Sequence, residues 1–333
     1  MGVLVTGGAG YVGSHIVDVL AEQGRSCVAM DTLEFGSRSA VHDQAPFVLG
    51  SVADADLVRS TCERYAIDAV IHCAAYKSVA HSMRDPSAYF INNVENSRRL
   101  FETLIGVGIQ HVVFSSSCSV YGNPAAIPVT EDEPIRPQSP YGESKVMVER
   151  LLSWFGRCHG LRSVSLRYFN AAGAAPGGHI GEDWTVSQNL IPLVLEAVLD
   201  RRPPVVVFGG DYPTADGTAV RDYIHVTDLA EAHLRALEYL ENAGSTTVVN
   251  LGTGVGSSVL EVLRVASNVA GRPVPHEIAE RREGDPACVY ADNRRARDLL
   301  GWQPRLDLEA MIATAYRWHL RGGLHLETAL ERS

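Results

Sequence analysis

A glycine-rich turn directly after a short apolar run constrains this chain more than any other feature. The run Val3–Thr6 predicts a buried strand, and it leads into the sequence GGAGYVG at residues 7–13. The three spaced glycines permit a tight turn and a close approach of the backbone to a ligand. The helix predicted over Val12–Gln23 then presents its unpaired N–H groups to phosphate. The turn therefore predicts a dinucleotide pyrophosphate site.

An acidic residue stands where such a site needs one. Asp31 ends the second predicted strand, 18 residues after Gly13, and a carboxylate at that place accepts hydrogen bonds from the adenosine ribose. A carboxylate also repels a 2′-phosphate, so the pattern favours NAD over NADP. Arg38 is the one nearby residue that argues the other way, because a guanidinium could hold a 2′-phosphate.

Short apolar runs alternate with helix-period segments through the first half of the chain. This alternation predicts βαβ units and therefore an α/β fold with a doubly wound parallel sheet of the Rossmann type. The alternation of strands and helices ends after residue 170. Ala171–Gly181 is predicted to be a loop, and a smaller C-terminal α/β lobe is predicted to follow it. The predicted strands are Val3–Thr6, Ser26–Asp31, Pro46–Leu49, Ala69–Cys73, His111–Ser115, Ser163–Arg167, Val205–Phe208 and Thr247–Asn250. The predicted helices are Val12–Gln23, Asp54–Tyr65, Asn92–Gly106, Pro140–Gly160, Leu190–Asp200, Val226–Leu240 and Ser258–Val269.

Composition excludes several classes of partner. The chain has 39 acidic and 29 basic residues in 333, a formal net charge of −10, which argues against nucleic acid or an anionic membrane as the main partner. No stretch approaches the 18 or so apolar residues of a membrane span. The six cysteines form no C-x-x-C pair and no Cys/His cluster with zinc spacing. We therefore expect a protein without a metal site in the cytoplasm, where scattered thiols stay reduced.

Two rare lysines stand beside the predicted cofactor site. Only Lys77 and Lys145 are lysines, so arginine supplies the remaining basic charge. Tyr141 precedes Lys145 by four residues at the start of a predicted helix, which places both side chains on one face. A phenol has a pKa of about 10 and is a weak base at neutral pH, and a neighbouring ammonium lowers that pKa. Chance gives roughly 0.07 Tyr-x-x-x-Lys pairs in this composition, so the spacing favours a catalytic tyrosine over a surface pair.

A run of serines follows another predicted strand. Ser115–Ser117 lies at the end of His111–Ser115, and ligands bind at the carboxyl ends of strands in a doubly wound sheet. A hydroxyl from this run could hydrogen-bond the oxygen that Tyr141 deprotonates, although a simple serine-rich turn would read the same. Lys77 follows the strand Ala69–Cys73 and so points to the same edge.

On these residues the chain resembles the UDP-glucose (UDP-galactose) 4-epimerase family of the extended short-chain dehydrogenase/reductase superfamily. The glycine turn, Ser117, Tyr141 and Lys145 mark the superfamily. The blocks DYPTADGTAVRDYIHV and RREGD are more specific for the epimerase branch. The matching blocks run in order from residue 3 to residue 287: VLVTGGAGYVGSH (3–15), AIDAVIHCAAYKSV (66–79), NNV (92–94), FSSSCSVYG (114–122), PQSPYGESK (137–145), LRYFNAAGA (166–174), FGGDYPTADGTAVRDYIHVTDLAEAH (208–233), NLGTGVGSSVLEV (250–262) and RREGDPA (281–287).

The resemblance implies an epimerase that inverts C4 of a UDP-hexose, UDP-glucose or UDP-galactose, through a 4-keto intermediate with tightly bound NAD. Tyr141 would remove the proton of the C4 hydroxyl. Lys145 would bind the nicotinamide ribose and keep the pKa of Tyr141 low, and Ser117 would hydrogen-bond O4. The keto sugar would then turn over, so that hydride returns to its other face.

The resemblance also implies two sets of binding residues. Residues 1–170 would form the NAD-binding domain, and residues 171–333 would form the nucleotide-sugar lobe, interleaved with late elements of the first domain. The residues expected to bind the cofactor are Gly7, Gly10, Tyr11, Val12, Gly13, Asp31, Ser51, Val52, Cys73, Ala74, Ala75, Lys77, Asn92, Ser115, Tyr141, Lys145, Tyr168 and Phe169. The residues expected to bind the UDP-sugar are Lys77, Ser117, Tyr141, Asn170, Asn189, Leu190, Phe208, Arg221, Arg282, Asp285 and Val289.

Three of the implied substrate residues also fit from their chemistry. Arg221 and Arg282 can bind a diphosphate in bidentate geometry, although each is one of 27 arginines. Asp285 could accept hydrogen bonds from ribose or could simply pair with Arg281. Val289 stands where the family faces the sugar C2 substituent and where a bulky aromatic excludes N-acetyl groups. We therefore predict that UDP-GlcNAc and UDP-GalNAc are accepted beside UDP-glucose and UDP-galactose.

Two places depart from the family pattern on the adenosine side. The family commonly has an acid after the third strand, where this chain has Ser51, and a hydroxyl is a weaker acceptor. The loop Thr32–Gly36, which contains Phe35, is less polar than is usual in the family. These departures leave the adenosine contacts open.

Three alternative functions are weighed against the epimerase. A nucleotide-sugar 4,6-dehydratase would use an Asp-Glu pair as the acid and base that eliminate water. This chain has Cys118-Ser119 at that place, and neither residue is a carboxylate. A non-catalytic NAD-binding sensor would not need Tyr141 or Lys145. An ordinary alcohol dehydrogenase would release NADH and consume stoichiometric NAD.

The predicted helices Asn92–Gly106 and Tyr141–Phe155 carry more apolar residues than one sheet face needs. Members of the family often pair such helices between subunits, and the alternative is packing on the sheet alone. We expect a homodimer.

Overall fold

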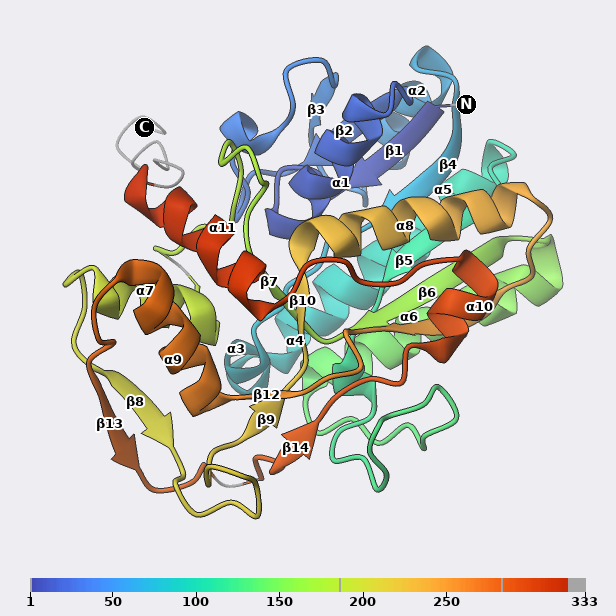
Figure 1. Cartoon of the computed structure of the whole chain (residues 1–333). Helices are drawn as coiled ribbons and strands as arrows, with labels where there is room; N and C mark the ends of the chain where they lie inside the picture. Colours follow the sequence, from blue (N-terminus) through green and yellow to red (C-terminus); the bar gives the residue numbers. More distant parts are fainter. Residues whose placement is uncertain (1, 186, 283, 323–333) are drawn as a thin grey trace.

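A seven-stranded parallel sheet forms the larger part of the computed structural model, which describes residues 2–185, 187–282 and 284–322 (Figure 1). Its strand order is β11-β6-β5-β4-β1-β2-β3, and every neighbouring pair is parallel. The predicted doubly wound α/β fold is confirmed. The strands are β1 (Gly2–Thr6), β2 (Cys27–Asp31), β3 (Phe47–Leu49), β4 (Ile67–His72), β5 (His111–Ser115), β6 (Arg162–Tyr168) and β11 (Thr247–Leu251).

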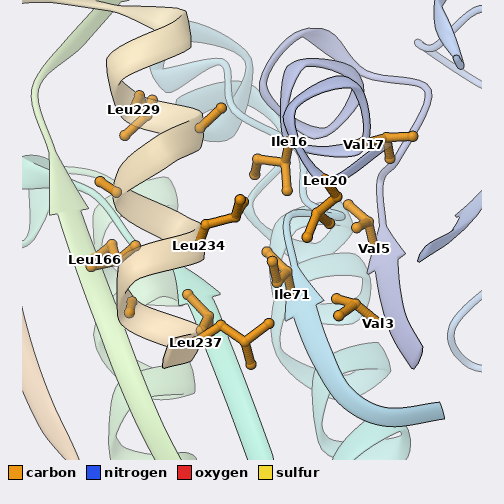
Figure 2. Packing of buried hydrophobic residues seen from close by; sticks show 14 of the residues in the cluster. Val3, Val5, Ile16, Val17, Leu20, Ile71, Leu166, Leu229, Leu234 and Leu237 are labelled. Atoms are coloured by element: carbon orange, nitrogen blue, oxygen red, sulfur yellow. The ribbon is translucent and has the colours of Figure 1, made fainter. Parts of the chain in front are cut away.

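Alternating side chains on the strands build a core on each face of the sheet. Val3 and Val5 pack with α1 (Tyr11–Glu22) and α8 (Val226–Glu241), and Figure 2 shows both helices over that face. Leu4 points to the opposite face, which is covered by α2 (Ala55–Arg64), α5 (Asn96–Gly106) and α6 (Pro140–His159). Both faces are therefore buried, as a parallel sheet requires.

The chain reverses its winding direction between β1 and β4. These two strands are neighbours, and the strands that follow each of them are added on opposite sides of the pair. In doubly wound sheets, ligands bind at the carboxyl ends of the strands on either side of such a reversal. The glycine turn follows β1 and Cys73 follows β4, so both lie at this point.

A second group of elements forms the lobe at the lower left of Figure 1. Its apolar core joins α7 (Leu190–Val198), α9 (Val259–Ala270) and α11 (Leu308–Leu320) to the parallel pair β8 (Val205–Phe208) and β13 (His276–Ala279). A small sheet with the order β12-β9-β14 lies nearer the large sheet; it consists of β12 (Ser257–Ser258), β9 (Val220–Arg221) and β14 (Cys288–Val289).

Two late segments return to the first sheet. β11 pairs with β6 at the sheet edge, and α8 packs against α1. The division into residues 1–170 and 171–333 stays a proposal, with β11 and α8 as the late elements that join the first part. The remaining elements are η1 (Arg38–Ala40), α3 (Val79–Arg84), α4 (Pro86–Tyr89), η2 (Phe90–Glu95), η3 (Cys118–Val120), β7 (Asn170–Ala172), β10 (Tyr223–His225) and α10 (Arg294–Leu300).

Two predicted segments differ from the structure. The helix predicted from Asn92 begins as the π-helix η2, where the Asn93 amide hydrogen-bonds the backbone of Tyr76 and the hydroxyl of Ser144. The predicted loop Ala171–Gly181 begins within β7, because Ala171 and Ala172 pair with Ile224 and His225 of β10. Both differences depend on contacts with distant residues, which local periodicity does not report.

No helix in the described ranges is long and apolar enough to cross a membrane. Those same ranges bring together no group of three His, Cys, Asp or Glu side chains that could hold a metal ion.

Candidate active site

The glycine turn forms a cradle that side chains would fill. Gly7 has φ +69°, and a Cβ there would lie 2.7 Å from the backbone nitrogen of Ala74. A Cβ on Gly13 would lie 2.0 Å from the carbonyl oxygen of Gly7. Gly10 caps α1 with an extended backbone, so the first N–H groups of the helix face the turn. This geometry fits a dinucleotide pyrophosphate, and so the residues present fit NAD.

Asp31 is positioned at the end of β2 beside this cradle. One carboxylate oxygen accepts a hydrogen bond from Ala9 N at 3.0 Å, and the other accepts from Leu33 N at 2.9 Å. The carboxylate therefore fixes the turn, and its negative charge stays at the place expected for the adenosine ribose. Arg38 does not approach it as a direct partner; its guanidinium stacks over the Phe47 ring at 5.1 Å.

The structure places the two segments that depart from the family pattern on the adenosine side, Ser51 and the loop with Phe35. Ser51 Oγ accepts a hydrogen bond from Ala53 N at 3.1 Å, and the neighbouring Val52 is buried. Phe35 is exposed and meets the Tyr76 ring edge-on at 5.6 Å. The Tyr76 hydroxyl donates to the Glu34 carboxylate.

Helix α6 brings Tyr141 and Lys145 under the carboxyl end of β5. Ser139 caps the helix by accepting from Gly142 N, and Pro140 occupies the first turn. The Lys145 ammonium donates to the carbonyl oxygen of Ser115 at 2.8 Å and lies 5.8 Å from the centre of the Tyr141 ring. The predicted pair therefore shares one helix face.

Burial governs the protonation of this pair. Burial raises the pKa of Tyr141 to about 12, while a hydrogen bond with Ser117 acts in the opposite direction. Burial also lowers the pKa of Lys145 to about 8. In the chain alone the pKa of Tyr141 therefore lies above that of free phenol, opposite to the lowering expected from Lys145, because desolvation of the phenolate outweighs the hydrogen bond with Ser117.

The three serines of the run face different partners. Ser117 is the one that bonds Tyr141, and its Oγ also accepts from Ser119 N at 3.1 Å. Ser115 Oγ lies 2.8 Å from Nε2 of His233, and Ser116 donates to the Glu149 carboxylate at 2.5 Å. Of the three, Ser117 alone is a partner of the tyrosine.

The small sheet holds the two arginines expected at the diphosphate. Arg221 in β9 is the register partner of Val289 in β14, and its guanidinium donates to the carbonyl oxygen of Pro286 at 2.9 Å. Arg221 also pairs with Asp285 at 3.4 Å. Arg282 lies 3.9 Å above the centre of the Phe208 ring.

These contacts bear on one of the two interpretations of Asp285, namely that it only pairs with Arg281. Its partner is Arg221 and not Arg281, which pairs instead with Asp211 at 2.6 Å. Asp285 therefore lies beside the expected diphosphate site.

Val289 and the segment after the serine run pack against the same apolar cluster. It packs against a group of buried side chains that includes Val120, Val146 and Phe169, and Cys118 packs against the same group. The side chain that would face the sugar C2 substituent is therefore joined by direct packing to the segment that follows Ser117.

Lys77, Asn189 and Tyr11 meet at the boundary of the two lobes. The Lys77 ammonium pairs with Glu182 at 3.1 Å, and Asn189 at the start of α7 donates to the same carboxylate at 2.7 Å. The Tyr11 hydroxyl donates to the carbonyl oxygen of Gly173 at 2.7 Å.

The other predicted residues lie along the same edge. Cys73 Sγ is 3.1 Å from Ser115 Oγ, and Asn92 donates to Asn93. Tyr168 and Phe169 lie at the end of β6. The remaining predicted residues are Val12 in α1, Ala74 and Ala75 after β4, Asn170 in β7 and Leu190 at the start of α7.

Sequence reasoning missed three residues that organise the site. Glu182 joins Lys77 to Asn189, and Asn93 holds the backbone of Tyr76. Asp222 accepts hydrogen bonds from the backbone of Thr253, Gly254 and Ala291 and so ties the loop after β11 to the small sheet. Asn93 and Asp222 lie within the matching blocks at 92–94 and 208–233, but their roles, like that of Glu182, depend on partners distant in the sequence, which those blocks do not identify.

Comparison with known proteins supports one family. Residues 3–252 match the model of the NAD dependent epimerase/dehydratase family. A UDP-glucose 4-epimerase of Streptococcus mutans is 46% identical over 322 residues, which cover 96% of this chain and 97% of the relative.

Solved structures give the same result. A UDP-glucose 4-epimerase from Brucella ovis in complex with NAD is 44% identical, with a TM-score of 0.93 over 95% of this chain and 97% of its own. A UDP-glucose 4-epimerase from Bifidobacterium longum in complex with NAD⁺ and UDP is 36% identical, with a TM-score of 0.89 over 96% and 98%.

Proposed function

This chain belongs to the NAD dependent epimerase/dehydratase family, and we propose that it interconverts UDP-glucose and UDP-galactose by inverting C4, with NAD as its cofactor. The observation that carries the proposal is the meeting of Tyr141, Lys145 and Ser117 at the sheet edge that also holds the glycine cradle. Tyr141 is 7% exposed, so its phenol is shielded from bulk water.

NAD would lie between the cradle at Gly7 and the pair Tyr141–Lys145, with Asp31 at its ribose. Bound NAD supplies the hydride acceptor and donor that inversion at C4 requires. Lys145 would donate to the nicotinamide ribose, for which its ammonium is already held against Ser115. Lys77, from the end of β4, would add a second cation on the same edge.

Tyr141 acts on the proton of the sugar C4 hydroxyl. As phenolate it removes that proton, and as phenol it returns the proton to O4 when the 4-keto sugar is reduced on its other face. The hydrogen bond of Ser117 favours the phenolate, against the burial that raises its pKa. The Lys145 ammonium, 5.8 Å from the ring centre, would add to this preference as a cation. Ser117 would also hydrogen-bond O4 and so hold the hydroxyl in reach of Tyr141.

The second lobe would hold the UDP part. Arg221 and Arg282 would contact the diphosphate, Asp285 the uridine ribose, and Phe208 would pack against the base. Asn170, Asn189 and Leu190 would complete the pocket from the other side. A sugar that is held mainly through its diphosphate can rotate about the diphosphate bonds and present either face to the same tyrosine.

The alternatives fit the residues of this chain less well. Elimination of water by a 4,6-dehydratase requires an acid and a base, and Cys118-Ser119 supplies neither carboxylate. Burial raises the pKa of Cys118 to about 12, so this thiol stays protonated at neutral pH. A sensor would have no use for a buried Tyr141–Lys145 pair, and an alcohol dehydrogenase would not need a UDP pocket.

Finer points of the function are also proposed. Val289 would admit N-acetyl groups, so that UDP-GlcNAc and UDP-GalNAc are substrates as well. The chain would work as a homodimer in the cytoplasm, in galactose and related carbohydrate metabolism. Residues 1–170 would bind NAD and residues 171–333 the nucleotide sugar.

Turnover without added cofactor tests the function. The purified protein is incubated with UDP-glucose, and UDP-galactose is measured by chromatography. The epimerase converts one into the other with no NAD supplied. A requirement for stoichiometric NAD would indicate a dehydrogenase, and a 4-keto-6-deoxy product would indicate a dehydratase.

A further inference from the structure

Glu182 is a buried carboxylate between the two lobes. Its residue is 5% exposed, and it follows the Gly-rich segment after β7. A single oxygen, Oε1, receives Lys77 at 3.1 Å, Ser187 at 2.9 Å and Asn189 at 2.7 Å. A buried carboxylate needs such donors to offset the loss of its hydration.

The backbone around Glu182 is held in place independently of these donors. Trp318 of α11 donates to the carbonyl oxygen of Glu182 at 2.9 Å. Gly181 pairs with Ala174 in an isolated antiparallel bridge, and a Cβ on Gly181 would lie 2.6 Å from the Trp318 ring. The backbone of Glu182 therefore stays in place, and because Lys77 and Asn189 share Oε1, a shift of either partner changes how strongly the carboxylate holds the other.

The partners of Glu182 come from the two halves of the site. Lys77 follows β4 on the cofactor edge, and its ammonium lies 5.9 Å from the ring of Tyr11 in the glycine turn. Asn189 caps α7 on the UDP side. Glu182 is close enough to Tyr11 for its charge to raise the pKa of that phenol, beyond the larger effect of burial.

From this arrangement we propose that Glu182 is a positioning residue that couples retention of NAD to binding of the UDP moiety. The inference rests on the proposed function and adds a residue to it. When Asn189 engages the UDP-sugar, it draws less on Oε1, and the Glu182 carboxylate then holds Lys77 more firmly at the cofactor edge. Because coupling between two sites is reciprocal, bound NAD favours UDP by the same factor by which UDP favours NAD.

The test measures NAD binding with and without UDP. The dissociation constant of NAD is measured by ultrafiltration of the diluted holoprotein, first alone and then with saturating UDP. In the natural protein UDP tightens NAD binding at least about fivefold, the lower end of typical coupling between sites. In Glu182→Gln, which keeps the shape but loses the charge, this ratio falls toward one.

Two further variants keep the test decisive. Asp183→Asn is the matched control, because that neighbouring carboxylate accepts from Thr185 within its own loop, and its ratio stays as in the natural protein. Lys77→Met removes the other member of the Lys77–Glu182 ion pair. Because the Lys77 side chain is 65% exposed, this variant is expected to fold, and it replaces Glu182→Gln in the test if that protein does not fold. The double variant Glu182→Gln/Lys77→Met is expected to have the same ratio of NAD dissociation constants as either single variant, because both substitutions remove the same contact.

The outcomes separate this inference from the function. The coupling role is overturned if UDP does not change the NAD affinity of the natural protein. It is also overturned if Glu182→Gln keeps the full ratio of NAD dissociation constants without and with UDP, even where UDP-glucose is converted. A ratio that depends on Glu182 in a protein without conversion overturns the epimerase proposal alone. A purely structural role for Glu182 changes the unfolding midpoint and leaves the ratio unchanged.

Discussion

Burial sets the protonation of the two residues that carry the chemistry. Tyr141 and Lys145 are both nearly inaccessible, and burial raises the pKa of the first to about 12 and lowers that of the second to about 8. Each shift favours the neutral form. The site thus holds a neutral phenol and a readily deprotonated amine until a ligand changes the local charge.

The Lys145 shift predicts a pH-dependent stability. Below about pH 8 the ammonium is charged in both the folded and the unfolded chain, and burying it costs about 3 kcal/mol, the equivalent of the drop from 10.5 to about 8. Between pH 8 and 10.5 the folded chain loses this proton first, so stability rises with pH.

Cofactor-free Lys145→Met is therefore expected to gain stability over the natural chain at pH 7 and to lose most of this advantage by pH 10.5. Denaturant unfolding of both proteins at the two pH values measures the difference. An advantage that does not change with pH would mean that the lysine is not buried as a charge.

Val289 carries a prediction about substrate range. Its packing beside Phe169 and the Ser117 segment predicts that Val289→Tyr fills the space for a C2 N-acetyl group. Conversion of UDP-GlcNAc is expected to fall at least about tenfold, because misfit of a few atoms costs about 1–3 kcal/mol, while conversion of UDP-glucose persists. If the natural protein does not convert UDP-GlcNAc, the proposed breadth is wrong.

At the level of elements, helix α6 is fixed by a buried ion pair. Tyr141, Lys145 and Glu149 follow one another at four-residue spacing on one helix face. Arg167 of β6 binds both oxygens of Glu149 at 2.9 and 2.6 Å and also donates to Tyr121 at 2.9 Å. The pair thereby joins the catalytic helix to the sheet, and Ser116 is tied to the same carboxylate.

Removing one member of this pair is predicted to be costly. Arg167→Met leaves Glu149 as a buried charge without its cation, and the expected loss in free energy of unfolding is about 3–5 kcal/mol. Arg235→Met, which removes a half-exposed arginine on α8 paired with Glu238 at 3.1 Å, is expected to lose less than about 1 kcal/mol. Equal losses in the two variants, measured by denaturant unfolding, would refute the buried pair as an anchor.

Elements also mark the limit of prediction from sequence. The alternating runs predicted the seven sheet strands and the helices α1, α2, α6 and α8 to within a few residues, because each carries its own hydrophobic period. Strands such as β9, β12 and β14 have two residues each, too few for any period. The site was predictable where chemistry is coded locally, as in Tyr141–Lys145, and not where it depends on long-range contacts, as at Glu182 and Asn93.

At the level of the whole molecule, two elements that pack against each other, η2 and α6, carry exposed apolar side chains. Ile91 of η2 is exposed, Met147 is half-exposed, and Trp154 of α6 is 61% exposed. Large apolar side chains gathered on one face mark an association surface, and α6 packs against η2 and α5. These elements form the proposed dimer seam.

The seam predicts a mass of twice the 36.0 kDa chain in sedimentation equilibrium. Trp154→Glu is expected to shift the protein toward monomer, because it adds a charge to the seam. Val255→Glu is the matched control, since Val255 is 69% exposed but follows β11 and lies outside η2, α5 and α6, and it leaves the dimer intact. A natural protein that sediments as a monomer would contradict the seam.

The central claim is that the Tyr141 phenol moves the proton of the sugar C4 hydroxyl. The most direct measurement compares the natural protein with Tyr141→Phe, in which only that hydroxyl is missing, for conversion of UDP-glucose and for binding of UDP by calorimetry. We predict that conversion falls by at least about 10²-fold, as expected for the loss of a general base, while UDP binds with unchanged affinity. Conversion at the natural rate by Tyr141→Phe would contradict the account.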